Sequence, residues 1–233
     1  MSSNSPIIVA LDYPTAQEAI EFVSKITPSS CRLKVGNELF TAAGTDFVWE
    51  LVKDGFDVFL DLKYHDIPNT VANACRAAAD LGVWMVNVHC LGGRKMLEAA
   101  SEAMQHSLHK PLLIGVTLLT SSDESTLVDM GLQPGIEKHV SRLAKIAQES
   151  GLDGVVCSAN ECTTLRHELG ATFKLVTPGI RLERSQVVGD DQQRISTPKE
   201  ALQSGASYLV IGRPITQAVN PLKTLNTISE LLE

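Results

Sequence analysis

Three charged side chains, those of Asp61, Lys63 and Asp66, lie at or just beyond the end of the apolar run 58–62. The run is apolar enough to form a buried strand, in which residues two apart lie on one face, roughly 6.5 Å from each other. Asp61 and Lys63 are therefore predicted to share a face. Asp66 follows as the chain turns toward Pro68, a residue that suits the first turn of a helix. An ammonium between carboxylates stays protonated and can act as a proton donor.

A fourth charged residue, Lys34, is predicted to lie in the same cluster. Lys34 lies within the apolar run 32–36, so two cations and two anions are expected to meet. Such a cluster suits a reaction in which negative charge develops on a carbon atom that must then be protonated. The alternative is a strand end whose charges are simply solvated or paired. We favour a functional site because α/β proteins build their sites at the carboxyl ends of parallel strands.

Short apolar runs alternate with helical patterns along the whole chain. The expected strands cover 7–11, 32–36, 58–62, 84–89, 112–119, 154–158, 173–179 and 208–212, and the last helix covers about 215–232. Eight strands that alternate with helices predict an α/β protein with a closed (β/α)8 TIM barrel. An open doubly wound sheet is the alternative, but no Gly-x-Gly-x-x-Gly follows the first strand and no Gly-x-x-x-x-Gly-Lys-Ser/Thr loop is present.

A barrel would gather the polar residues near these strand ends at one mouth. They are Asp12, Lys34, Asp61, Lys63, Thr120, Arg181 and Arg213. The segments that follow the last two strands, 178–181 and 211–214, lie where this fold commonly binds phosphate. Gly179 and Gly212 would permit close backbone approach, and each segment also carries an arginine, which offers a fork of donors. We therefore expect a phosphorylated substrate.

The segment 180–195 differs from the rest of the chain. It is rich in charged and amide side chains, too polar for the core and too long for a tight connection. A long loop over the active end of a barrel favours a mobile lid that grips the phosphate. A solvated loop without function is the alternative. Apart from this loop, residues 1–233 are expected to form a single catalytic domain.

Composition excludes several classes of function. The 20 basic and 27 acidic residues give a net charge of −7, which argues against a surface for nucleic acid or acidic membranes. The five cysteines form no Cys-x-x-Cys pair, so buried reduced thiols are expected rather than disulfides or a zinc site. No basic segment precedes the first apolar run, and no apolar run approaches the length of a membrane span. These features predict a cytoplasmic protein.

The stretch Asp61-Leu-Lys-Tyr-His-Asp-Ile-Pro-Asn-Thr70 resembles the signature of the orotidine 5′-monophosphate decarboxylase family. Shorter matches at 10–12, 33–36, 177–181 and 210–214 support the resemblance and occur in the right order. The resemblance implies a (β/α)8 barrel, usually a homodimer with active sites at the subunit interface. It also implies conversion of orotidine 5′-monophosphate to UMP and CO2, the last step of de novo pyrimidine synthesis, with neither a metal nor an organic cofactor.

The resemblance also implies roles for the charged residues. Lys63 resembles the proton donor to C6 of the pyrimidine, and Asp61 resembles the carboxylate that faces the substrate carboxylate. Lys34 would belong to the charge network and to the ribose site. Asp12 would bind a ribose hydroxyl.

The remaining roles concern the neighbouring subunit, the base and the phosphate. Asp66 and Thr70 resemble residues that reach into the partner's site, and Thr120 matches a pyrimidine contact that Ser121 could share. The phosphate end is matched by Arg181, Gln192, Gly212 and Arg213, with Gln193 as an alternative to its neighbour.

Two rival functions are weighed against this one. A metal-dependent sugar-phosphate decarboxylase or epimerase could use a similar Asp-x-Lys-x-x-Asp pattern, but it would favour a carboxylate on the second strand, where this chain has Lys34. A non-catalytic nucleotide-binding barrel would have no reason to place an ammonium between carboxylates.

Overall fold

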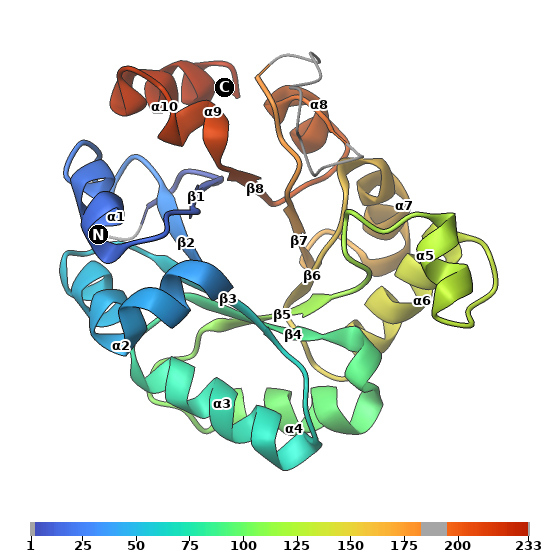
Figure 1. Ribbon diagram of the computed structural model, residues 1–233. Coiled ribbons are helices and arrows are strands. Elements are labelled where there is room, and N and C mark those ends of the chain that lie inside the picture. Colours follow the sequence, from blue (N-terminus) through green and yellow to red (C-terminus); the bar gives the residue numbers. More distant parts are fainter. Residues whose placement is uncertain (1–2, 183–194, 233) are drawn as a thin grey trace.

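A computed structural model describes residues 3–182 and 195–232 of the chain. Eight parallel strands pair in sequence order, and β8 pairs with β1 to close the barrel (Figure 1). The strands are β1 (Ile7–Leu11), β2 (Arg32–Gly36), β3 (Val58–Tyr64), β4 (Met85–His89), β5 (Leu112–Val116), β6 (Gly154–Val156), β7 (Lys174–Thr177) and β8 (Tyr208–Ile211). The predicted (β/α)8 barrel is confirmed.

Helices surround the strands as an outer ring (Figure 1). They are α1 (Ala16–Val23), α2 (Asn37–Lys53), α3 (Pro68–Asp80), the 3₁₀ turn η1 (Cys90–Gly92), α4 (Arg94–Gln105), α5 (Glu124–Asp129), α6 (Ile136–Glu149), α7 (Ala159–Leu169), α8 (Pro198–Gln203), α9 (Arg213–Thr216) and α10 (Pro221–Glu230). Local sequence fixes several starts. The hydroxyl of Thr15 accepts the N–H of Glu18 at 3.3 Å, and Pro68 begins α3 as predicted.

The barrel interior is filled by apolar side chains from alternate strand positions. This inner cluster consists of Ile8, Ala10, Phe59, Met85, Ile114, Val176 and Val210. Lys34 pairs in register with Ala10 on one side and Phe59 on the other, so it belongs to the same inward-facing layer. Asp12 and Asp61 follow Ala10 and Phe59 by two residues, and strand alternation therefore directs both carboxylates to the mouth above this layer.

The amino-terminal end of the barrel is closed by Arg32. Its guanidinium lies 4.5 Å from the ring centre of Trp84 and 5.2 Å from that of Tyr208, and Nε lies 3.3 Å from Oδ2 of Asp57. It also donates to the backbone carbonyl of Ser5. This packing fills one end of the barrel and leaves the carboxyl-terminal end for a cavity.

The structure corrects several expected boundaries. The strands expected at 112–119, 154–158 and 173–179 end at Val116, Val156 and Thr177. The central strand expected at 58–62 continues to Tyr64. The single helix expected at 215–232 is two helices, because the chain leaves the helical conformation after Thr216 and Pro221 begins α10.

Two further observations concern the predicted location of the protein. No helix within the described ranges combines the length and the apolar character that a membrane crossing needs. The five cysteines are all buried and unpaired, as predicted: Cys31, Cys75, Cys90, Cys157 and Cys162.

Candidate active site

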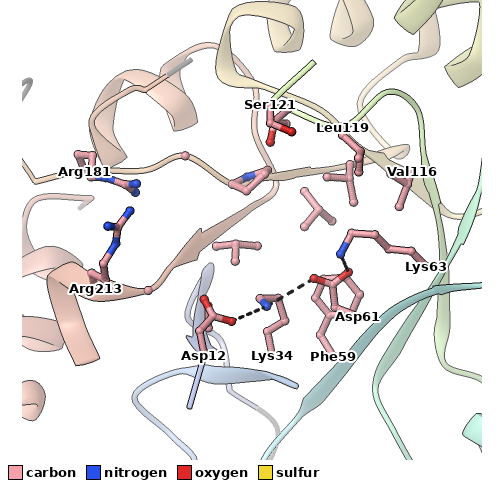
Figure 2. A pocket seen from close by; sticks show the side chains of 18 of the residues that line it. Asp12, Lys34, Phe59, Asp61, Lys63, Val116, Leu119, Ser121, Arg181 and Arg213 are labelled. Atoms are coloured by element: carbon pink, nitrogen blue, oxygen red, sulfur yellow. Dashed lines mark hydrogen bonds and ion pairs between the residues drawn. The ribbon is translucent and has the colours of Figure 1, made fainter. Parts of the chain in front are cut away.

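A cavity of about 570 Å³ opens at the carboxyl-terminal end of the barrel. Its polar lining includes Asp12, Lys34, Asp61, Lys63, Thr120, Ser121, Arg181 and Arg213. Its floor is apolar, with Phe59, Val156 and Val176 from three strands. The volume lies in the range of pockets that hold small organic ligands. Figure 2 shows the charged side chains converging on this space.

Four of the charged residues form a chain of alternating sign. Nζ of Lys34 lies 3.1 Å from Oδ1 of Asp12 and 3.5 Å from Oδ2 of Asp61. Nζ of Lys63 lies 2.7 Å from Oδ1 of Asp61. Each cation therefore has a carboxylate next to it, and Asp61 lies between two ammonium groups (Figure 2).

Of the two lysines in this cluster of charges, Lys34 is the more deeply buried, with 9% of the residue exposed. Burial by itself would lower the pKa of Lys34, but the charges and hydrogen bonds of Asp61 and Asp12 outweigh it and raise the pKa above its usual range. Lys34 is therefore an ammonium at neutral pH. It supplies a fixed positive charge on the side of Asp61 that faces away from Lys63.

Lys63 reaches Asp61 through an irregular backbone. Its φ of 52° is the only positive value among the described residues other than glycine, and the pairing of β3 with β4 shifts between Leu60 and Tyr64. A left-handed conformation costs a residue with a side chain roughly 1–2 kcal/mol. The predicted meeting of Asp61 and Lys63 is confirmed, although a local distortion and not regular strand alternation brings it about.

Asn87 is a site residue that sequence reasoning missed. It lies on β4 with no exposed surface. Its Oδ1 accepts the backbone N–H of Lys63 at 2.8 Å, and its Nδ2 donates to Oδ1 of Asp61 at 2.7 Å. The signal available in the sequence was an uncharged polar residue in the otherwise apolar stretch 84–88, where a buried amide needs polar partners.

The opposite end of the cavity carries two arginines. Figure 2 shows the guanidinium groups of Arg181 and Arg213 pointing toward each other, on the side away from Lys63. Gly179 adopts a φ of 78° that favours glycine, and Gly212 lines the cavity beside Arg213. The backbone N–H of Arg181 donates to the carbonyl of Ser196 at 2.9 Å.

The other predicted residues fall into three groups. Thr120 and Ser121 both line the cavity, so both remain candidates for a contact with the base. Gln192 and Gln193, with most of the predicted lid, lie outside the described residues. Asp66 and Thr70 are exposed on the connection to α3 and at its start, and neither lines the cavity.

The acidic residues that line the cavity in the described part of the chain do not form a metal site. Among the described residues, no group of three or more His, Cys, Asp or Glu side chains is arranged to hold a metal ion. Between Asp12 and Asp61, where a cation would be attracted, Nζ of Lys34 already supplies the positive charge.

The fold and the site together define a class: a (β/α)8-barrel enzyme with a polarised cavity for a small anionic substrate. Comparison with known proteins then identifies the family. The model of the orotidine 5′-phosphate decarboxylase / HUMPS family matches residues 5–228, and the chain belongs to this family.

Individual relatives agree with this assignment. An orotidine 5′-phosphate decarboxylase of Laribacter hongkongensis (strain HLHK9) is 61% identical over 225 residues, covering 97% of this chain and 92% of the relative. One of Hydrogenovibrio crunogenus is 58% identical over 223 residues, covering 96% and 94%. The crystal structure of the Lactobacillus acidophilus orotidine 5′-phosphate decarboxylase superposes with a TM-score of 0.88 at 38% identity, covering 99% of this chain and 100% of that one. The resemblance inferred from the motifs is confirmed.

Proposed function

We propose that the protein decarboxylates orotidine 5′-monophosphate to UMP and CO2, the last step of de novo pyrimidine synthesis, and that Lys63 protonates C6. Membership of the family supports the reaction. The observation that carries the mechanism is the position of Lys63, whose Nζ lies 2.7 Å from Asp61 at the end of the charge chain. Lys63 lies at one end of the cavity and the arginine pair lies at the other (Figure 2). The arginines can anchor an anionic substrate while the ammonium of Lys63 delivers a proton to it.

The substrate lies along the cavity from the arginines to Lys63. Arg181, Gly212 and Arg213 bind the phosphate, with Gln192 from the segment outside the described residues. Asp12 and Lys34 bind the ribose hydroxyls, because they lie between the arginines and Asp61 (Figure 2). The base rests on the apolar floor, within reach of Thr120 and Ser121.

The chemistry requires one bond to break and one to form. The bond from C6 to the carboxylate carbon breaks, CO2 leaves, and the electron pair remains on C6. Nζ of Lys63 then gives its proton to C6, which yields UMP and a neutral amine that regains a proton from solvent. Charges fixed before the reaction stabilise the carbanion without any rearrangement of the site, which is the largest source of rate enhancement in many enzymes.

Asp61 holds the proton donor in place. It faces the substrate carboxylate and accepts hydrogen bonds from Lys63 and Asn87 through the same oxygen, Oδ1. Binding of the phosphate and ribose at the far end supplies energy that can be expressed in the transition state.

The protein works as a homodimer in which Asp66 and Thr70 complete the partner's site. Both residues are exposed in the single chain. Between them Ile67 is 67% exposed, and Leu91, on the connection after the neighbouring strand, is 44% exposed. Exposed large apolar side chains beside polar residues that do not line their own cavity suit a contact between subunits. A cytoplasmic location is supported by the five unpaired cysteines.

Loss of pyrimidine absorbance from orotidine 5′-monophosphate tests the proposal, with and without EDTA. We expect turnover that the chelator does not change, because lysines and not a metal supply the positive charge of the site. Activity that disappears with EDTA would favour a metal-dependent decarboxylase or epimerase. UMP binding without turnover of its precursor would favour a non-catalytic nucleotide-binding protein.

A further inference from the structure

We propose that Asn87 is the positioning residue that holds Lys63 and Asp61 in register for proton transfer. The inference rests on the proposed function and adds a residue from a different strand to it. Asn87 does not line the cavity, so it acts through the two residues to which it is hydrogen-bonded.

The register of the barrel explains why a side chain is needed here. Leu60 pairs with Val86 and Tyr64 pairs with Val88. Three residues of β3, from Asp61 to Lys63, therefore face the single residue Asn87 of β4. Regular backbone pairing cannot continue across such a mismatch, because a bulged strand leaves its extra residues unpaired. The amide of Asn87 takes the place of the missing partner.

The two hydrogen bonds fix the orientation of the amide. Oδ1 of Asn87 lies 2.8 Å from a backbone N–H, which can only donate, and Nδ2 lies 2.7 Å from the carboxylate of Asp61, which accepts when ionised. The reversed amide would place donor against donor and acceptor against acceptor. One planar group thus links the backbone of Lys63 to the carboxylate that holds the Nζ of Lys63.

This link controls where the ammonium points. The left-handed backbone of Lys63 is unfavourable by itself and persists only where its surroundings hold it. The hydrogen bond that its N–H donates to Asn87 is one such restraint, and the hydrogen bond that its Nζ donates to Asp61 is another. Without Asn87 both restraints weaken together, and the donor loses its alignment with C6.

Few other residue types could make both bonds from this position. Asn87 is fully buried, so a larger side chain would disturb the packing around it and an apolar one would leave the N–H of Lys63 unpaired. An aspartate has nearly the same shape and could accept from Lys63, but its charge would repel Asp61 and it could not donate while ionised.

The test compares Asn87→Ala, Asn87→Asp and the wild type, with rates expressed per UMP-binding site. We expect Asn87→Ala to lower kcat about 100-fold, the size of effect that a misplacement of about 1 Å can cause. The KM for orotidine 5′-monophosphate and the affinity for UMP should change by no more than about threefold, since phosphate and ribose contacts remain. Asn87→Asp should be slower still, whereas a role in packing alone would make this isosteric change the milder one.

Ser101→Ala is the matched control. Ser101, on α4, is also buried, and its hydroxyl donates to the carbonyl of Gly151 at 3.0 Å, away from the residues that line the cavity. This variant should lower the melting temperature and keep the wild-type kcat, which separates loss of a buried hydrogen bond from loss of alignment.

The outcomes distinguish the two proposals. Failure of the wild type to turn over orotidine 5′-monophosphate would refute the proposed function. If the wild type turns over the substrate and the kcat of Asn87→Ala lies within about threefold of the wild-type kcat, the role of Asn87 is refuted. A proportional fall in UMP affinity, or an Asn87→Asp variant faster than Asn87→Ala, would also overturn it. If Asn87→Asp binds no UMP, the kcat of Asn87→Ala decides alone.

Discussion

Nζ of Lys63 lies 2.7 Å from Oδ1 of Asp61, although the two residues are only two positions apart on β3. This pair is joined to Lys34 through the other oxygen of the carboxylate, at 3.5 Å. Asp61 therefore lies between two ammonium groups and attracts both. Because the three charges are in contact, we expect mutations at these positions to have coupled effects.

Removal of the Lys63 side chain should abolish proton delivery. We expect Lys63→Ala to lower kcat by about 10³-fold or more, toward the upper end of what a positioned proton donor contributes. UMP binding, measured by calorimetry, should remain, because the arginine pair at the other end is unchanged. Lys53→Ala, which removes an exposed lysine from the end of α2, is the control. Near-normal turnover by Lys63→Ala would remove its assigned role.

Loss of Arg213 should act on binding more than on chemistry. A hydrogen bond to a charged group contributes about 1.5–3 kcal/mol, so Arg213→Ala should raise the KM for orotidine 5′-monophosphate by about 10- to 100-fold. The comparison is with orotidine, which has no phosphate. If Arg213→Ala impairs the use of orotidine by the same factor as the use of orotidine 5′-monophosphate, Arg213 does not bind the phosphate.

Mixtures of two inactive variants test whether sites are shared between subunits. Asp66→Asn and Lys63→Ala should each be nearly inactive as homodimers. A heterodimer would contain one site with both changes and one site with neither, so mixing and reassembly should recover up to half of the activity per heterodimer. Activity is measured on heterodimers isolated by two different affinity tags. No recovery in such heterodimers would count against shared sites.

Protonation of His89 should make stability depend on pH. Burial, together with the electrostatic effects of the neighbouring His65 and Lys63, lowers the pKa of His89, and Asp61 only partly offsets this. The unfolded chain, with a histidine pKa of about 6.5, therefore binds the proton more readily. The contribution of neutral His89 to the free energy of unfolding is fully present above that value, and it is lost as pH falls through the pKa of His89 in the folded protein.

Urea unfolding at a series of pH values measures this effect. Below pH about 6.5, the free energy of unfolding of His89→Gln should fall less steeply with decreasing pH than that of the wild type. The two slopes should differ by at most about 1.4 kcal/mol per pH unit, which corresponds to one proton. His109→Gln, which changes an exposed histidine between α4 and β5, should keep the wild-type decline. An unchanged slope in His89→Gln would contradict the assignment.

The sequence by itself determined the barrel and the identity of most residues around the cavity. Periodicity is a local property, so eight apolar runs were enough to predict eight strands, and strand ends were enough to place Asp12, Lys34 and Asp61 at one mouth. The two arginines of the opposite end followed from the same reasoning.

Only the tertiary structure decided how Lys63 is held. Its left-handed backbone and its bond to Asn87 arise because three residues of β3 face one residue of β4, a register that depends on how the whole barrel closes. The two residues are 24 positions apart in the chain, and no local pattern relates them. A hydrogen bond between strands depends on their register. Strands buried on both faces are almost continuously apolar, so their hydrophobic pattern does not specify that register.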